Sequence, residues 1–266
     1  MKTKTRISKK KILTTTVKTT VAALVSAVML ETASAQAQST NLLIDDFNES
    51  QQVDTNPNNA IPIRSQVGPV GDILGGINNG FRDMFITDVI NTSGEPSNRS
   101  SLLSGSGEGF FSNDFGVTST GVVRWDGAND TQQIDVGGLG GINIVEDNLD
   151  RIMMGLSVDL PGLGVAFNIY DVSGNVSSIA RTFDSSIPTR VQEDFLFSDF
   201  VGNANFTDVG AIELVLRGTP RMDVSINLVE FASPPPQTIP EPTSMLGLLV
   251  IGATGAGSIL KRKHNR

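Results

Sequence analysis

The stretch Val165–Phe183 reads VAFNIYDVSGNVSSIARTF, and it decides the fold class of the middle of the chain. Its two ends, Val165–Tyr170 and Val176–Phe183, are rich in β-branched and aromatic residues, which favour strands. Between them, Ser173–Asn175 carries a glycine where a hairpin turn needs one. The stretch therefore predicts two neighbouring antiparallel strands.

Similar short runs lie on both sides of this hairpin, separated by Gly, Asn, Asp and Pro. They are Leu42–Phe47, Met84–Ile90, Val117–Trp125, Ile152–Val158, Ala211–Leu216 and Val224–Phe231. No segment of the body keeps a helical apolar period over ~12 residues. Roughly ten to twelve strands predict one all-β, jelly-roll-like β-sandwich over residues 39–233.

Two regions of the body give further local expectations. Alternation in the last run places Ile226, Leu228 and Phe231 toward the core. The stretch Asn48–Asn79 is poor in apolar residues and rich in Asn, Gln and Pro, so we expect long loops there.

Charge is strongly partitioned along the chain. Between Ser39 and Ile239 there are no lysines, nine arginines and 26 acidic residues, a formal charge of −17. Nucleic acid as a partner is excluded, because a phosphate backbone needs neutralising cations. The charge favours cations or neutral polymers as partners.

Several catalytic classes are excluded by missing residue types. The chain has no cysteine, its one histidine is His264, and the body has no lysine. Thiol chemistry, Ser–His–Asp sites, histidine-based metal sites and Schiff bases are therefore excluded from the body. Glycoside hydrolysis needs only two carboxylates ~5–10 Å apart, but among 26 acidic residues such a pair also arises by chance. We do not expect an enzyme.

The N-terminus, residues 1–37, has the three parts of an export signal. The basic stretch Lys2–Lys18 precedes the apolar run Val21–Leu30, which is too short to span a bilayer stably. Small residues follow at signal-peptidase spacing, and we expect cleavage after Ala35 or Ala37.

The C-terminus has the order of a membrane anchor. A Pro-rich linker, residues 234–242, precedes Thr243–Leu260, an uncharged stretch of 18 residues. At helical rise this stretch measures about 27 Å, enough to cross a bilayer core. The basic tail, residues 261–266, then stays cytoplasmic and leaves the acidic body outside.

The triplet Pro240, Glu241 and Pro242, the apolar helix and the basic tail together resemble the PEP-CTERM sorting signal over residues 240–266. The resemblance implies processing by an exosortase-like enzyme near the triplet. It also implies anchoring in the inner membrane before processing, release to the cell surface or medium afterwards, and association with extracellular polysaccharide.

The body itself resembles the galactose-binding-like jelly rolls. The resemblance lies in Asp45–Phe47, in Trp125–Gly127 and in Phe206–Glu213. It implies that the first and last strands pair near the ends of the domain.

Two candidate sites follow. Asp45, Asp46 and Glu230 meet if the first and last strands are neighbours, and their oxygens suit one structural calcium ion. Asp126–Asp130 is a second oxygen-rich loop; for both, an Asx turn or an exposed strand end is the alternative. Trp125, with Asp126 beside it, is the candidate for stacking on a sugar, unless Trp125 lies in the core.

The residues therefore predict first a non-catalytic, exported surface or matrix protein associated with exopolysaccharide. A carbohydrate-binding module is the alternative, and a glycosidase with an acidic pair is the third. An exposed Trp125 favours the second, and a cleft lined by two carboxylates favours the third.

Overall fold

The computed structural model describes residues 41–56, 61–69, 74, 80–128 and 133–234. The expected signal peptide, sorting triplet, membrane helix and basic tail lie outside these residues, as do Asn129 and Asp130 of the second oxygen-rich loop. Residues 39–234 form one compact unit, described here by itself. Within the described ranges, no helix has the length and apolar content that crossing a bilayer requires.

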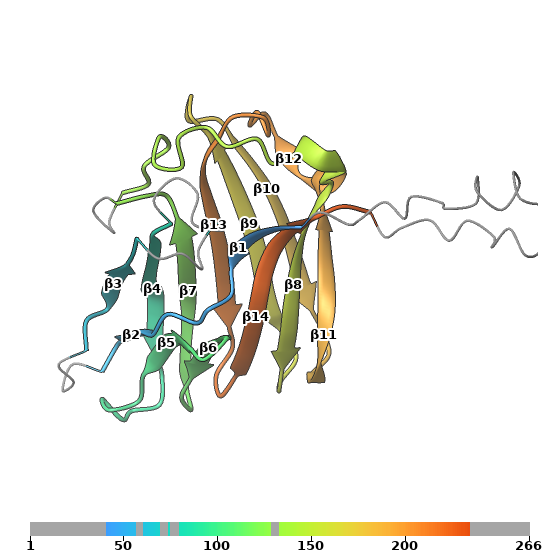
Figure 1. Ribbon diagram of the computed structural model, residues 1–266. Coiled ribbons are helices and arrows are strands. Elements are labelled where there is room, and N and C mark those ends of the chain that lie inside the picture. The colour runs from blue at the N-terminus through green and yellow to red at the C-terminus, as the bar shows by residue number, and fades with distance from the viewer. Residues whose placement is uncertain (1–40, 57–60, 70–73, 75–79, 129–132, 235–266) are drawn as a thin grey trace, which may run out of the picture. The chain divides into compact units, whose positions relative to one another are not determined.

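The described residues form two antiparallel sheets (Figure 1). Sheet A has the spatial order β11 (Ile187–Leu196), β8 (Arg151–Val158), β14 (Asp223–Ala232), β6 (Glu108–Asn113), β5 (Ser100–Gly105) and β2 (Gln51–Asp54), with β1 (Leu42–Asp45) also on β14. Sheet B has the order β12 (Val201–Gly202), β10 (Val176–Phe183), β9 (Leu163–Asp171), β13 (Val209–Gly218), β7 (Val117–Trp125), β4 (Arg82–Asn91) and β3 (Arg64–Val67). The described residues also include the 3-10 turns η2 (Glu146–Asn148) and η3 (Phe197–Asp199).

The first and last strands pair, as the jelly-roll resemblance implied. β14 has β8 along one edge, while β6 and β1 share its other edge. Leu42 lies opposite Phe231, near the C-terminal end of β14. The beginning and the end of the sandwich therefore meet in one sheet.

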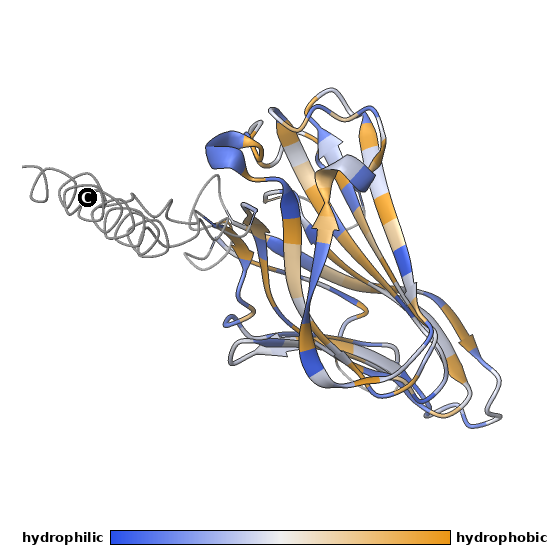
Figure 2. Cartoon of the chain, turned by 90° about the vertical axis from the view of Figure 1, so that its right-hand side faces the viewer, coloured by the Kyte–Doolittle hydropathy of each residue, from blue (hydrophilic) through white to orange (hydrophobic). Residues whose placement is uncertain are grey.

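Alternation of apolar and polar side chains builds the core, and Figure 2 shows the alternation along the strands. In β8 every second residue from Ile152 to Val158 is buried. Phe111 of sheet A reaches sheet B, where two glycines receive its ring. A Cβ atom would lie 2.8 Å from that ring at Gly121 and 2.7 Å from it at Gly218. The ring therefore occupies a slot that any side chain would close.

A buried polar cluster also joins the two sheets. The Arg82 guanidinium, on β4 of sheet B, donates two hydrogen bonds of 2.8 Å to the Asp45 carboxylate of β1 in sheet A. Its other donors reach Gln51 Oε1, Ser104 Oγ and the Glu49 carbonyl, so all five N–H groups are used. We call Asp45, Arg82, Gln51 and Ser104 the inter-sheet clasp.

The all-β prediction is confirmed, with corrections. The described residues hold fourteen strands, more than expected, and the region 48–79 contains the short strands β2 and β3 besides loops. The prediction for Leu228 is wrong, since it is 42% exposed. A bulge between Asn227 and Val229 shifts the register, so Val229 turns inward and Leu228 outward.

Candidate functional site

A row of polar side chains crosses the outer face of sheet B. In β7, Trp125 is buried in the core, so its neighbour Arg124 points to the outer face. Glu213 of β13 lies opposite Arg124 on one side and opposite Asn168 of β9 on the other. Ser178 of β10 lies opposite Asn168. We call Arg124, Glu213, Asn168 and Ser178 the sheet B row.

Hydrogen bonds connect the whole row. Arg124 Nε and Nη2 donate to Glu213 Oε2 at 3.0 and 2.7 Å. Asn168 Nδ2 donates to Glu213 Oε1 at 2.9 Å, and Ser178 Oγ donates to Asn168 Oδ1 at 2.7 Å. Both oxygens of Glu213 are therefore occupied, which suits a positioning role better than that of a nucleophile or acid.

The row is buried at one end and open at the other. Arg124 and Glu213 are each 8% exposed, whereas Asn168 and Ser178 are half-buried. Arg124 Nη1 is buried and has no hydrogen-bond partner among the residues that the structure describes. Because a buried donor without a partner costs about 1–3 kcal/mol, this nitrogen calls for an acceptor oxygen from water or from a ligand.

Tyr170 lies beside the row, two residues after Asn168 on the same face of β9. Burial raises the pKa of the Tyr170 hydroxyl, the negative charge of Glu213 raises it further, and Arg124 opposes the rise. The phenol therefore stays neutral near pH 7 and keeps its donor. Its half-buried ring adds the one tyrosine of the chain to this face.

An apolar strip runs parallel to the row, two residues away from it along each strand. Phe85, Val122 and Val215 lie opposite one another on β4, β7 and β13, and all three are buried. The Arg124 guanidinium carbon lies 4.8 Å from the centre of the Phe85 ring. Because the strip itself is buried, the groups that a ligand with hydroxyl edges and C–H faces meets first are the half-buried Asn168, Ser178 and Tyr170.

The structure corrects the sequence-based sugar site. Trp125 is fully buried, and its indole Nε1 donates to Asp45 Oδ2 at 2.8 Å, so it cannot stack on a sugar. Asp126 is 1% exposed, and its Oδ2 accepts a hydrogen bond from the Asp135 backbone nitrogen at 2.9 Å. Asp126 therefore holds a loop.

Fluorescence can check this placement, because Trp125 is the only tryptophan. We expect a blue-shifted emission that iodide quenches far less than it quenches free tryptophan. Added polysaccharide should leave the emission unchanged even when binding is seen by another method. A quenching constant close to that of free tryptophan would contradict the burial of Trp125.

The three carboxylates proposed for calcium have separate partners. Asp45 belongs to the inter-sheet clasp, Asp46 caps its own turn through the Asn48 nitrogen, and Glu230 accepts a hydrogen bond of 2.8 Å from Asn41 Nδ2. Nowhere in the described ranges do three Asp, Glu or His side chains form a group that could hold a metal ion. The structure therefore does not bring these residues together as a calcium site.

Sequence reasoning missed the sheet B row. The signal was present in part, since an inward Trp125 in an alternating strand requires an outward Arg124. Which acid would face Arg124 depended on the pairing of β7 with β13. Residue 124 is 89 positions away from residue 213, and no local pattern fixes such a pairing.

Comparisons with known proteins give distant structural similarity alone. No family model and no curated protein matches the sequence. A family 11 carbohydrate-binding module of a cellulosomal cellulase from Clostridium thermocellum matches with 8% identity, a TM-score of 0.34, and coverage of 72% of this chain and 94% of that one. A mutant family 29 carbohydrate-binding module matches with 7% identity, a TM-score of 0.34, and coverage of 77% and 99%. At these scores the similarity carries neither a function nor a site over to this chain.

Proposed function

We propose that this chain is an exported, non-catalytic protein of the bacterial surface that binds polysaccharide on the outer face of sheet B. One observation carries the binding proposal: Arg124 Nη1 is a buried donor with no acceptor among the described residues, on the face that also carries the half-buried Tyr170 and Asn168. A sugar hydroxyl supplies the acceptor, and the phenol ring supplies a face for the sugar C–H groups.

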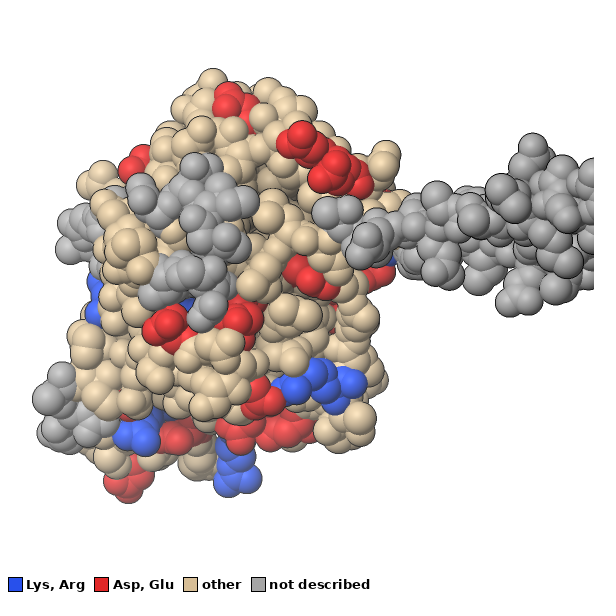
Figure 3. Space-filling view, viewed as in Figure 1, with Lys and Arg blue, Asp and Glu red and all other residues tan. Residues whose placement is uncertain are grey.

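The electrostatics support a neutral or cationic polymer. The body carries nine arginines against 26 acidic residues, and Figure 3 shows acidic side chains scattered over one side of the molecule with few basic ones among them. Within the row, the charges of Arg124 and Glu213 compensate each other at 2.7 Å. An anionic polymer would meet repulsion from the surface and no surplus of positive charge at the site.

Export and sorting rest on residues outside those that the structure describes. In this proposal, residues 1–37 direct export, and Pro240, Glu241 and Pro242 mark the site for an exosortase-like enzyme. The segment 243–260 holds the chain in the inner membrane until processing. The sandwich then stays at the surface or in the surrounding polysaccharide layer, with a function that needs no catalytic step.

A glycan array of residues 39–234, run with and without calcium, tests the binding proposal. We expect selective binding that Tyr170→Ala weakens about tenfold or more, because buried tyrosines at binding sites commonly contribute over ~1.4 kcal/mol. Arg124→Lys should weaken binding too, because lysine cannot both pair with Glu213 and offer the Nη1 donor. Phe115→Ala is the matched control, since Phe115 is a 57% exposed aromatic residue in the turn between β6 and β7, away from the row.

The outcomes separate the site from the function. Unchanged affinity in folded Tyr170→Ala and Arg124→Lys would contradict the placement on sheet B. No binding to any glycan under either condition would contradict polysaccharide binding altogether, and partner proteins would then be the better hypothesis for a surface role.

A further inference from the structure

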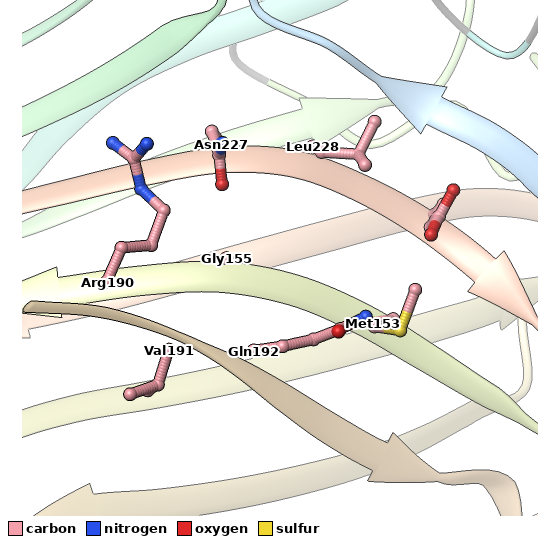
Figure 4. Close-up of a pocket in the computed structure, with 8 residues that line it drawn as sticks. Met153, Gly155, Arg190, Val191, Gln192, Asn227 and Leu228 are labelled. Carbon is pink, nitrogen blue, oxygen red and sulfur yellow. Dashed lines mark hydrogen bonds between the residues drawn. The ribbon is translucent and has the colours of Figure 1, made fainter. Parts of the chain in front are cut away.

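The outer face of sheet A carries a hollow of about 250 Å³. Strands β8, β11 and β14 surround it, and Figure 4 shows side chains from all three. The lining residues are Met153, Gly155, Arg190, Val191, Gln192, Asn227, Leu228 and Glu230. Because sheet A and sheet B pack against each other through their inner faces, this hollow and the sheet B row lie on opposite sides of the sandwich.

Two backbone features build the hollow. Gly155 lies opposite Gln192 on β11 and Asn227 on β14, and its missing side chain leaves the floor open. A Cβ atom there would lie 1.8 Å from Asn227 Oδ1. Leu228 has φ +43° at the bulge of β14, a conformation that is strained for a residue with a side chain. Bulges of this kind re-aim side chains, and such strain gathers at functional sites.

The chemistry of the lining is mixed. The Asn227 amide makes no hydrogen bond to another described residue, and it points to Gly155 in the hollow (Figure 4). Gln192 contacts the Met153 sulfur, while Arg190 is held by Glu108 and by Ser225. Amide donors and acceptors thus surround the apolar surfaces of Met153 and Leu228.

The volume of the sheet A hollow limits the size of a ligand that it can hold. About 250 Å³ lies below the ~300–1,000 Å³ typical of pockets for drug-sized ligands. The hollow therefore has room for about one sugar ring, taken from within a longer chain or from its end. Of the two charged residues in the lining, Arg190 is paired with Glu108 and Glu230 accepts a hydrogen bond from Asn41. The remaining amides and apolar surfaces fit a neutral sugar better than an ion.

We propose that the sheet A hollow is a second polysaccharide-binding site, and that one protein molecule therefore bridges two polysaccharide segments. The inference rests on the proposed function, because it takes the same ligand class for both faces. A short segment cannot reach both outer faces of the sandwich at once. Each molecule is then a cross-link in a polysaccharide layer, and avidity comes from joining two weak sites.

Cross-linking by the monomeric segment 39–234 tests the inference. A long polysaccharide that binds on the array is mixed with protein shown to be monomeric by sedimentation, and turbidity is followed. We expect wild type to give turbidity that short oligosaccharides reverse, and calorimetry with those oligosaccharides to give two sites per chain. Gly155→Gln, which fills the hollow, and Asn227→Ala, which removes its amide, should each lower the turbidity at least tenfold and leave one site.

The control is a substitution on the same face of sheet A but outside the hollow. Ser101→Gln adds the same side chain on the outer face of sheet A outside the hollow, and it should cross-link like wild type. One site per chain in wild type, or turbidity that persists in Gly155→Gln and Asn227→Ala, would overturn the second site and leave the sheet B proposal intact. Absence of all binding would overturn both proposals together.

Discussion

Replacing Asp45 by alanine should lower the free energy of unfolding by about 3–5 kcal/mol, because it leaves the fully buried Arg82 charge without its partner. The loss extends beyond the ion pair. Asp45 also accepts hydrogen bonds of 2.8 Å from Trp125 Nε1 and from the Phe47 backbone nitrogen, and both donors would remain buried. Urea unfolding measures the effect, as a lower midpoint with an unchanged slope.

The neighbouring residue provides the control. Asp46 is only partly buried and holds the turn at Asn48, so Asp46→Ala should cost about 1 kcal/mol or less. Equal losses for Asp45→Ala and Asp46→Ala would show that the clasp contributes nothing beyond an ordinary turn, and would contradict the structure.

The pH dependence of the stability of Arg82→Met is an independent test of the pairing between Arg82 and Asp45. Burial raises the pKa of the Asp45 carboxyl, and the Arg82 charge and the hydrogen bonds to Asp45 oppose that rise. Without Arg82 the folded-state pKa lies further above the unfolded value, so the folded state favours the protonated acid. The free energy of unfolding of Arg82→Met should therefore fall least below that of wild type at low pH. The difference should grow as the pH rises from the Asp45 pKa of folded wild type toward the higher Asp45 pKa of the folded variant.

The clasp also has a consequence for the binding face. Arg82 and Arg124 lie on the adjacent strands β4 and β7 of sheet B, where Asp83 is opposite Arg124. Arg82 faces the core and fixes the position of β4, while Arg124 faces outward and belongs to the sheet B row. A binding site on rigid strands needs such support from the core behind it.

Strong local patterns made much of the fold predictable. The hairpin of β9 and β10 runs as expected, with Gly174 at φ +83° in the turn. β5 and β6 were missed because their hairpin is rich in serine and glycine, and their burial comes from packing against β4, β7 and β13 of sheet B. β11 was missed because its Pro188–Gln192 part is exposed at the sheet edge and carries no apolar alternation.

The candidate sites were less predictable than the strands, for a physical reason. Trp125 and Asp45 stand out in sequence as chemistry-bearing residues, yet the core uses both. The outer faces are defined by long-range register, as with Arg124 and Glu213, or by a backbone defect, as with Leu228. A one-residue shift of register reverses which side chains face outward, and composition does not encode that shift.

The packing of Phe111 between the sheets predicts a second large loss of stability. Phe111→Ala removes a fully buried ring between the sheets and should cost about 3–5 kcal/mol. Phe110, the preceding residue of β6, is 37% exposed, so Phe110→Ala is the matched control and should cost far less. Thermal unfolding would show the difference as a shift of about 2–4 °C per kcal/mol for a domain of this size.

A double-mutant cycle then tests whether the glycines form the slot. Gly121→Ala alone should cost about 1–3 kcal/mol, because its Cβ would lie 2.8 Å from the Phe111 ring. In the Phe111→Ala background the same methyl group enters the space that the ring has left. Its cost should therefore fall, giving a coupling of about 0.5–3 kcal/mol. Strictly additive losses would mean that the Phe111 ring does not pack on Gly121, and that the two sheets meet in a different register.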